Sequence, residues 1–135
     1  MPDDERQVLR TLAEYGRWCD DGRFDEWAEL FTEDARLEVA GSVTEGREAI
    51  RSYMAEVQAD GRRGMHVTSG AVVDLGADGT AEAASDYLFV RPSADGPVIA
   101  AMGRYRDELV HDAGRWRFRR RTISILAVRG AVADG

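Results

Sequence analysis

Residues 65–91, MHVTSGAVVDLGADGTAEAASDYLFVR, decide the fold. Apolar and polar side chains alternate on both sides of Gly76-Ala77-Asp78-Gly79, a tetrapeptide typical of a hairpin turn. The alternation predicts one strand over residues 65–75 and a returning strand over 80–91. A helical period is absent from the whole stretch, so a sheet forms this part of the chain.

A second hairpin is expected further along. Residues 98–111 and 115–128 alternate in the same way and are separated by Asp112-Ala113-Gly114, which is typical of a tight turn. Residues 92–97, PSADGP, are expected to form the loop between the two hairpins, and the tail from residue 129 is expected to be frayed. Consecutive long strands of this kind predict an antiparallel meander.

The first 60 residues follow a helical period instead. The first helix should end near Asp20, with Gly22 as its stop. A second short helix is expected over residues 24–31, then a polar turn over 32–35 and a strand over 36–40. The apolar face of the first helix carries Val8, Leu12, Tyr15 and Cys19, and that of a third helix, after Gly46, carries Ile50, Tyr53, Met54 and Val57.

Helices followed by a meander predict an α+β fold in a single domain over residues 1–135. A curved sheet of four to six antiparallel strands over three helices makes a cone, and pockets form in the mouths of such half-barrels. A one-residue change of register would reverse which side chains face that pocket.

Composition excludes several kinds of function. All 18 basic residues are arginine, so lysine Schiff-base chemistry and a P-loop are absent, and the net charge is −7. The arginines between residues 115 and 121 alternate between the two sides of a strand, so we expect no nucleic-acid binding. We expect no metal site, because the chain has one cysteine and two histidines with no short spacing.

The same composition suggests where the protein works. No apolar run is long enough to span a membrane, and the N-terminus lacks a signal-peptide pattern, so we expect a cytoplasmic protein with no membrane partner. The many Arg, Ala, Gly and Asp residues, with no Lys or Asn, are typical of a GC-rich genome. We therefore expect an actinobacterial source.

His66 is the main candidate for chemistry. It lies within a predicted strand, whereas His111 precedes a predicted hairpin tip and is expected to be solvated. Asp20, at the end of the first helix, is the carboxylate that could orient the imidazole and make it a general base near neutral pH. The alternatives are that His66 is a structural residue and that Asp20 only ends the helix. Cys19 is expected to pack as a small apolar residue.

The chain resembles the SnoaL-like branch of the NTF2-like superfamily. Within this branch it resembles scytalone dehydratase, bile-acid 7α-dehydratase and polyketide cyclase relatives. The resemblance implies a cone fold, no cofactor and a homodimer paired through the open sheet face, with arginines at its rim. It is carried by YGRWCDDGRFDEWAELFTEDA at 15–35, EGREAI at 45–50, the strand histidine His66, GRYRD at 103–107 and GRWRF at 114–118.

The resemblance also implies roles for particular residues. His66 would be the base, Asp20 would orient it, and Tyr15 would donate a hydrogen bond to a substrate oxygen. Arg121 would bind or polarise a carbonyl or a leaving group. Either Asp86 or Tyr87 should line the pocket, and the sequence leaves that choice open. Further lining residues are expected to be Trp18, Phe31 and Tyr53.

These residues lead to one main expectation about function. The chain would be a lyase of the dehydratase type that acts on a small or polycyclic hydrophobic substrate. An isomerase or a polyketide-type cyclase with the same site is an alternative. A module that binds a small molecule or a partner subunit without catalysis is another.

Overall fold

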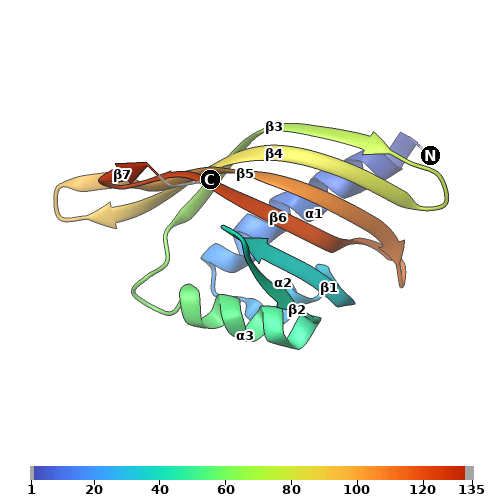
Figure 1. The fold of residues 1–135 in the computed structure, drawn as a ribbon, viewed down its shortest axis with the longest axis horizontal. Helices are drawn as coiled ribbons and strands as arrows, with labels where there is room; N and C mark the ends of the chain where they lie inside the picture. Colours follow the sequence, from blue (N-terminus) through green and yellow to red (C-terminus); the bar gives the residue numbers. More distant parts are fainter. Residues whose placement is uncertain (1, 133–135) are drawn as a thin grey trace.

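The computed structural model describes residues 2–132, which form three helices and a mixed sheet (Figure 1). The expected α+β class is confirmed, and the two long hairpins turn at the predicted tetrapeptide and tripeptide. The elements are α1 (Pro2–Asp20), α2 (Phe24–Ala28), β1 (Phe31–Val39), β2 (Ser42–Glu45), α3 (Arg47–Val57), β3 (Met65–Leu75), β4 (Thr80–Ser93), β5 (Gly96–Asp112), β6 (Arg115–Val128) and β7 (Ala131–Val132).

The strands follow the order β2-β1-β6-β5-β4-β3, and β7 pairs with the end of β6. Strands β3 to β6 form the predicted meander, but β1 runs parallel to β6, so the expectation of a wholly antiparallel sheet is wrong. The chain passes through α3 and the whole meander between these two strands. That long connection allows β6 to return beside β1 in the same direction.

Several local expectations also need correction. The second helix ends at Ala28 and not at residue 31, β4 and β5 extend into the expected loop at 92–97, and Ala131–Val132 of the expected frayed tail pair with β6. Residues 32–35 are part of β1 and do not form a turn, because the burial of Thr32 and Ala35 keeps them in the sheet, although the pairing with β6 is irregular between Phe31 and Arg36. The polar strand β2 was not predicted, and it pairs with β1 at the edge of the sheet.

Helix α1 ends where its sequence predicts. Gly22 adopts a φ of 71°, which permits the Arg23 N–H to donate to the Trp18 carbonyl at 2.8 Å and the Gly22 N–H to donate to the Cys19 carbonyl at 3.0 Å. The chain therefore leaves the helix directly after Asp20. This position brings the Asp20 carboxylate to the start of β3.

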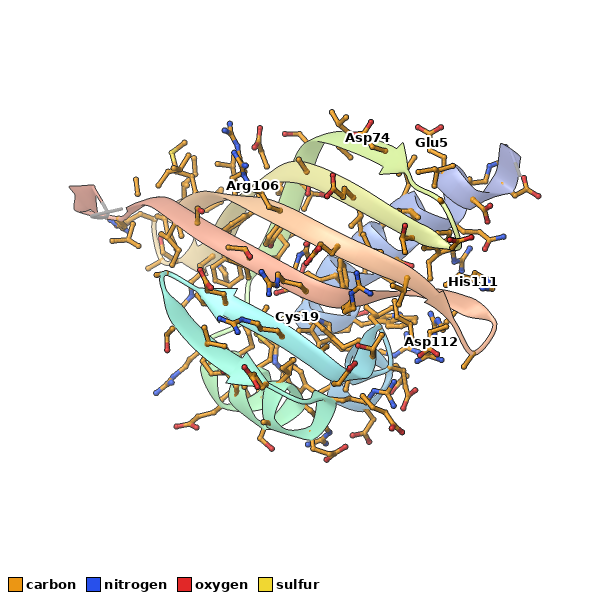
Figure 2. The ribbon with its side chains drawn as sticks, turned by 45° about the vertical axis from the view of Figure 1, so that its right-hand side comes forward. Glu5, Cys19, Asp74, Arg106, His111 and Asp112 are labelled. Atoms are coloured by element: carbon orange, nitrogen blue, oxygen red, sulfur yellow. The ribbon has the colours of Figure 1, made fainter. Side chains whose placement is uncertain are left out.

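The core lies between the concave side of the sheet and the helices. Strands β3 to β6 curve over α1, and α3 lies beneath β1 and β2 in Figure 1. An aromatic cluster fills the centre, with the Tyr15 ring in contact with the rings of Trp27, Phe31, Tyr105 and Phe118. On the outer side of the sheet the side chains are mainly charged, as Asp74 and Arg106 illustrate (Figure 2).

Candidate functional site

Asp20 and His66 form a two-point contact. The Asp20 Oδ1 lies 2.6 Å from the His66 ring Nδ1, and its Oδ2 accepts the His66 backbone N–H at 2.9 Å. An ionised carboxylate can only accept, so in the neutral imidazole this contact requires the ring hydrogen on Nδ1 and leaves the lone pair on Nε2. Both side chains are largely buried, with exposed fractions of 16% for Asp20 and 9% for His66. The carboxylate is thus fixed in position by the strand that carries the imidazole.

Gly16 allows this contact to form. A Cβ at Gly16 would lie 3.2 Å from the His66 Cβ, closer than most side-chain contacts. A glycine one turn before Asp20 therefore lets α1 approach β3. Helix and strand pack directly on each other at this point, which brings the end of α1 within hydrogen-bond distance of His66.

A cavity of about 410 Å³ opens beside His66. Its wall is mostly apolar or aromatic, and all four tyrosines of the chain line it. Larger hollows of about 610 and 670 Å³ lie elsewhere on the surface, but their linings are mainly charged. The cavity is lined by Tyr15, Val39, Tyr53, Met54, Val57, Gln58, Arg62, His66, Tyr87, Phe89, Arg91, Ala100, Ala101, Tyr105, Ile123 and Ile125.

The tyrosine hydroxyls of this cavity are free to act as donors. Among residues 2–132, those of Tyr15, Tyr87 and Tyr105 bond to no other group, and none is fully enclosed by protein. Burial raises the pKa of Tyr15 well above its usual value, and it also raises the pKa of Tyr87 and of Tyr105. At neutral pH each hydroxyl therefore stays protonated and can donate a hydrogen bond to an oxygen atom of a bound molecule.

The structure decides between Asp86 and Tyr87. Tyr87 faces the cavity and stacks on Tyr105 at 4.6 Å between ring centroids. Gly103 makes room for it, because a Cβ there would lie 2.6 Å from the Tyr87 ring. Asp86 points to the other side of the sheet, where its carboxylate bonds to Arg104 at 2.8 Å.

Arg121 does not reach this cavity, which corrects the expectation that it contacts substrate there. Its guanidinium bonds to the Asp107 carboxylate at 2.8 and 3.3 Å. The Tyr15, Tyr105 and Phe118 rings surround it, at 4.0, 3.6 and 4.5 Å from the guanidinium carbon. Arg121 is buried and paired with Asp107, and it borders a separate hollow of about 210 Å³ between α1 and β3. Its Nη1 has no hydrogen-bond partner among the described residues.

Two further lining predictions also need correction. Phe31 is completely buried in the aromatic core, where it packs on Trp27 and Phe118. Trp18 is half-buried at the edge of the core, away from the cavity lining, with the guanidinium groups of Arg23 and Arg115 near its ring. Tyr53 does line the cavity, as expected.

The remaining candidates lie apart from the cavity. Cys19 is buried, and burial raises the pKa of its thiol to about 12. His111 is exposed at the end of β5, with Asp112 beside it (Figure 2). Within residues 2–132, no group of three or more His, Cys, Asp and Glu side chains could hold a metal ion. The described helices include none long and apolar enough to cross a membrane.

The sequence analysis missed several lining residues. Gly103, Tyr105 and Asp107 are alternate residues of one strand, so their side chains share one face. This alternation could have placed Tyr105 inward. Gln58, Arg62 and Arg91 come from the end of α3, the following loop and β4. Nothing in their local sequence marks them, because they meet only through the fold.

The curved sheet over helices and the apolar cavity beside the Asp20–His66 pair are typical of cone-shaped α+β proteins with an internal site. Residues 2–122 match the SnoaL-like domain family, so the chain belongs to this family, as the sequence resemblance implied. No curated protein matches the chain.

Several solved structures have the same fold. Aln2 from a Streptomyces species is 26% identical, with a TM-score of 0.84 over 93% of this chain and 92% of that one. A candidate scytalone dehydratase from Novosphingobium aromaticivorans is 25% identical, with a TM-score of 0.80 over 100% and 98% of the two chains. An NTF2-like protein with a cystatin-like fold from the same species is 25% identical, with a TM-score of 0.82 over 92% and 82%.

Proposed function

We propose that this chain is a cofactor-independent lyase of the dehydratase type, with His66 as its general base. The observation that carries this proposal is the two-point contact of Asp20 with the His66 ring and backbone. It supports a fixed imidazole whose Nε2 is available to a molecule in the cavity. The likeness to a candidate scytalone dehydratase adds support.

The proposed step moves one proton and two bonding electron pairs, that of the C–H bond into the new double bond and that of the C–O bond onto the departing oxygen. Nε2 removes a proton from a carbon next to a carbonyl group, and the electrons of that C–H bond form a carbon–carbon double bond. The C–O bond to a neighbouring hydroxyl breaks, and the imidazolium returns its proton to form water. Asp20 stabilises the imidazolium, and Tyr15 donates a hydrogen bond to the carbonyl oxygen, where negative charge develops.

Isomerisation or ring closure would use the same proton transfer. Without a hydroxyl in position to leave, the carbanion would be reprotonated elsewhere or would attack a second carbonyl. A module that only binds its ligand predicts a histidine bonded to backbone alone. The Asp20 contact with Nδ1 favours the catalytic proposal over that alternative.

The proposal is tested with bicyclic β-hydroxy-ketones, whose dehydration is followed by the absorbance of the conjugated enone. We expect His66→Ala to lower turnover about 10²- to 10⁴-fold while ligand binding persists. His111→Ala is the matched control, because that histidine is exposed at a hairpin end. Full turnover by the His66 variant would contradict the mechanism.

We also propose that the chain forms a homodimer through the outer side of the sheet. Val72, Met102 and Leu126 are exposed there on β3, β5 and β6, and acidic and basic side chains are mixed around them. A mixed-charge surface can complement a second copy of itself around a two-fold axis. Sedimentation equilibrium should give a dimer for the native chain and a monomer for Met102→Glu, and a native monomer would contradict the proposal.

A further inference from the structure

The charges around the His66 cavity all have one sign. Of the described residues that line it, only Arg62 and Arg91 carry a permanent charge, in each case a guanidinium. None of the described residues that line it is an aspartate or a glutamate, although the chain has a net charge of −7. Asp20 lies behind His66 and is not part of the lining. The cavity is therefore a positive region in an acidic protein.

The two arginines are available to a ligand. Arg91 donates to the Gly61 carbonyl at 3.0 Å, which holds it against the loop that carries Arg62. Neither arginine forms an ion pair with a described carboxylate, whereas the neighbouring Arg63 lies 3.9 Å from Asp60. A guanidinium has five N–H donors, so Arg91 keeps donors free after its bond to Gly61.

Gln58 adds an uncharged polar group to the same wall. Its side chain is only 8% exposed, and its Oε1 is enclosed with no hydrogen-bond partner among the described residues. Such a buried oxygen costs about 1–3 kcal/mol of desolvation when nothing bonds to it. The amide nitrogen also bonds to no described residue and is not enclosed, so it can donate to a carbonyl of a bound molecule, and a flip of the amide would present the oxygen to a hydroxyl instead.

We propose that the cavity binds an apolar ring compound with an anionic group, which Arg62 and Arg91 hold while the ring packs on the aromatic wall. This inference names the substrate class for the site under "Proposed function" and depends on that site, although not on its reaction. A second polar group on the ring would bond to Gln58. The net charge of the chain is negative and repels anions in general. Two arginines without ion-pair partners at one apolar cavity therefore favour a ligand that combines an apolar ring with an anionic group.

Two probes of the same shape test the charge. 2-Naphthoate and 2-naphthamide differ only in the carboxylate, and neither can undergo elimination, so equilibrium binding by fluorescence is independent of catalysis. We expect the native chain to bind naphthoate about three- to tenfold more tightly than naphthamide. Added salt should weaken naphthoate binding and leave naphthamide binding unchanged.

Variants show which groups hold the carboxylate. Arg62→Gln and Arg91→Gln should each weaken naphthoate binding about threefold and leave naphthamide binding unchanged. The Arg62 side chain makes no hydrogen bond or ion pair with a described residue, so its variant should keep the native fold. Arg6→Gln removes the same charge from the exposed first turns of α1 and should have no effect.

Three results would overturn the inference. Equal binding of the two probes, or no binding of either at millimolar concentration, would exclude an anion-selective cavity. Loss of selectivity in His66→Ala alone would place the carboxylate at the imidazole and not at the arginines. If the arginines set selectivity but no hydroxy-ketone is dehydrated, the binding inference stands and the lyase proposal fails.

Discussion

Two carboxylate pairs of this protein have nearly the same geometry and opposite surroundings. Asp20 meets the His66 ring at 2.6 Å, and Asp107 meets the Arg121 guanidinium at 2.8 Å. The Asp20 pair borders a cavity, and its side chains keep exposed fractions of 16% and 9%. The Asp107 pair is sealed, with exposed fractions of 0% and 1%.

The two pairs differ in what surrounds the nitrogen atoms of the basic partner, which is the Arg121 guanidinium in one pair and the His66 ring in the other. Three aromatic rings lie around the Arg121 guanidinium, which is not part of the lining of the His66 cavity and borders a separate hollow of about 210 Å³. Burial raises the pKa of Asp107, while the Arg121 charge acts in the opposite direction. His66 keeps one ring nitrogen beside open space. An ion pair can therefore act on a ligand in the His66 cavity only if one of its atoms faces that cavity.

Replacement of each aspartate by asparagine should distinguish the structural role of Asp107 from the role proposed for Asp20 in catalysis. The loss of stability should be larger at Asp107. Asp107→Asn leaves the Arg121 charge buried without a counter-charge, which should lower the free energy of unfolding by about 3–5 kcal/mol. Urea denaturation followed by tryptophan fluorescence measures this loss.

A paired replacement is the control for this prediction. Asp107→Leu with Arg121→Met removes both charges together, and it should recover most of the stability lost in the single variant. If Asp107→Asn unfolds at the native urea concentration, the pair does not stabilise the fold as its burial indicates.

At the other pair, Asp20→Asn should affect turnover more than stability. An amide cannot accept from both the His66 N–H and the ring Nδ1, so the imidazole loses one fixed contact and the charge that supports its protonated form. We expect turnover of a dehydratable ketone to fall about 10- to 100-fold. The free energy of unfolding should fall by about 1 kcal/mol. A loss of stability as large as that of Asp107→Asn would remove the distinction between the two pairs.

The sequence predicted the Asp20 pair and not the Asp107 pair, for a reason of register. Counting back from the turn at 112–114 in simple alternation places Asp107 opposite Arg120. A bulge at Arg119 shifts the pairing by one residue, so Asp107 faces Arg121 and both side chains point into the core. One inserted residue thus moves Arg121 into an ion pair.

The elements that were predicted depend on local signals. Glycine turns and alternation fix the hairpins of β3–β4 and β5–β6, and the apolar period with Gly22 fixes the end of α1. The parallel contact of β1 with β6 depends on residues about 80 positions apart and has no local signal. The cavity residues after α3 were missed for the same reason.

A smaller effect is expected from Gly16→Ala, which disturbs the Asp20–His66 pair without removing either side chain. The new Cβ would lie 3.2 Å from the His66 Cβ, so helix and strand must separate by a few tenths of an ångström. Alanine favours a helix by about 0.5–1 kcal/mol over glycine, which should offset the strain and keep stability within about 1 kcal/mol of the native value. Turnover should still fall about threefold to tenfold, because small misplacements reduce proton transfer. Unchanged turnover at unchanged stability would show that the pair tolerates movement.

The smallest effect should come from Gln58→Met, at the cavity but away from both pairs. Methionine has a similar length and removes the enclosed oxygen that lacks a partner, so the free energy of unfolding should rise by about 1 kcal/mol. The same variant should bind 2-naphthoate unchanged and lose any preference for 6-hydroxy-2-naphthoate, because no amide remains to bond to the hydroxyl. Thermal unfolding and probe titration measure the two effects. A gain in stability together with that loss of selectivity would mean that the cavity keeps the Gln58 amide unpartnered for its ligand. The Asp107–Arg121 pair differs, because its two charges neutralise each other within the fold. A loss of stability would mean that the Gln58 amide already has a partner in the free protein.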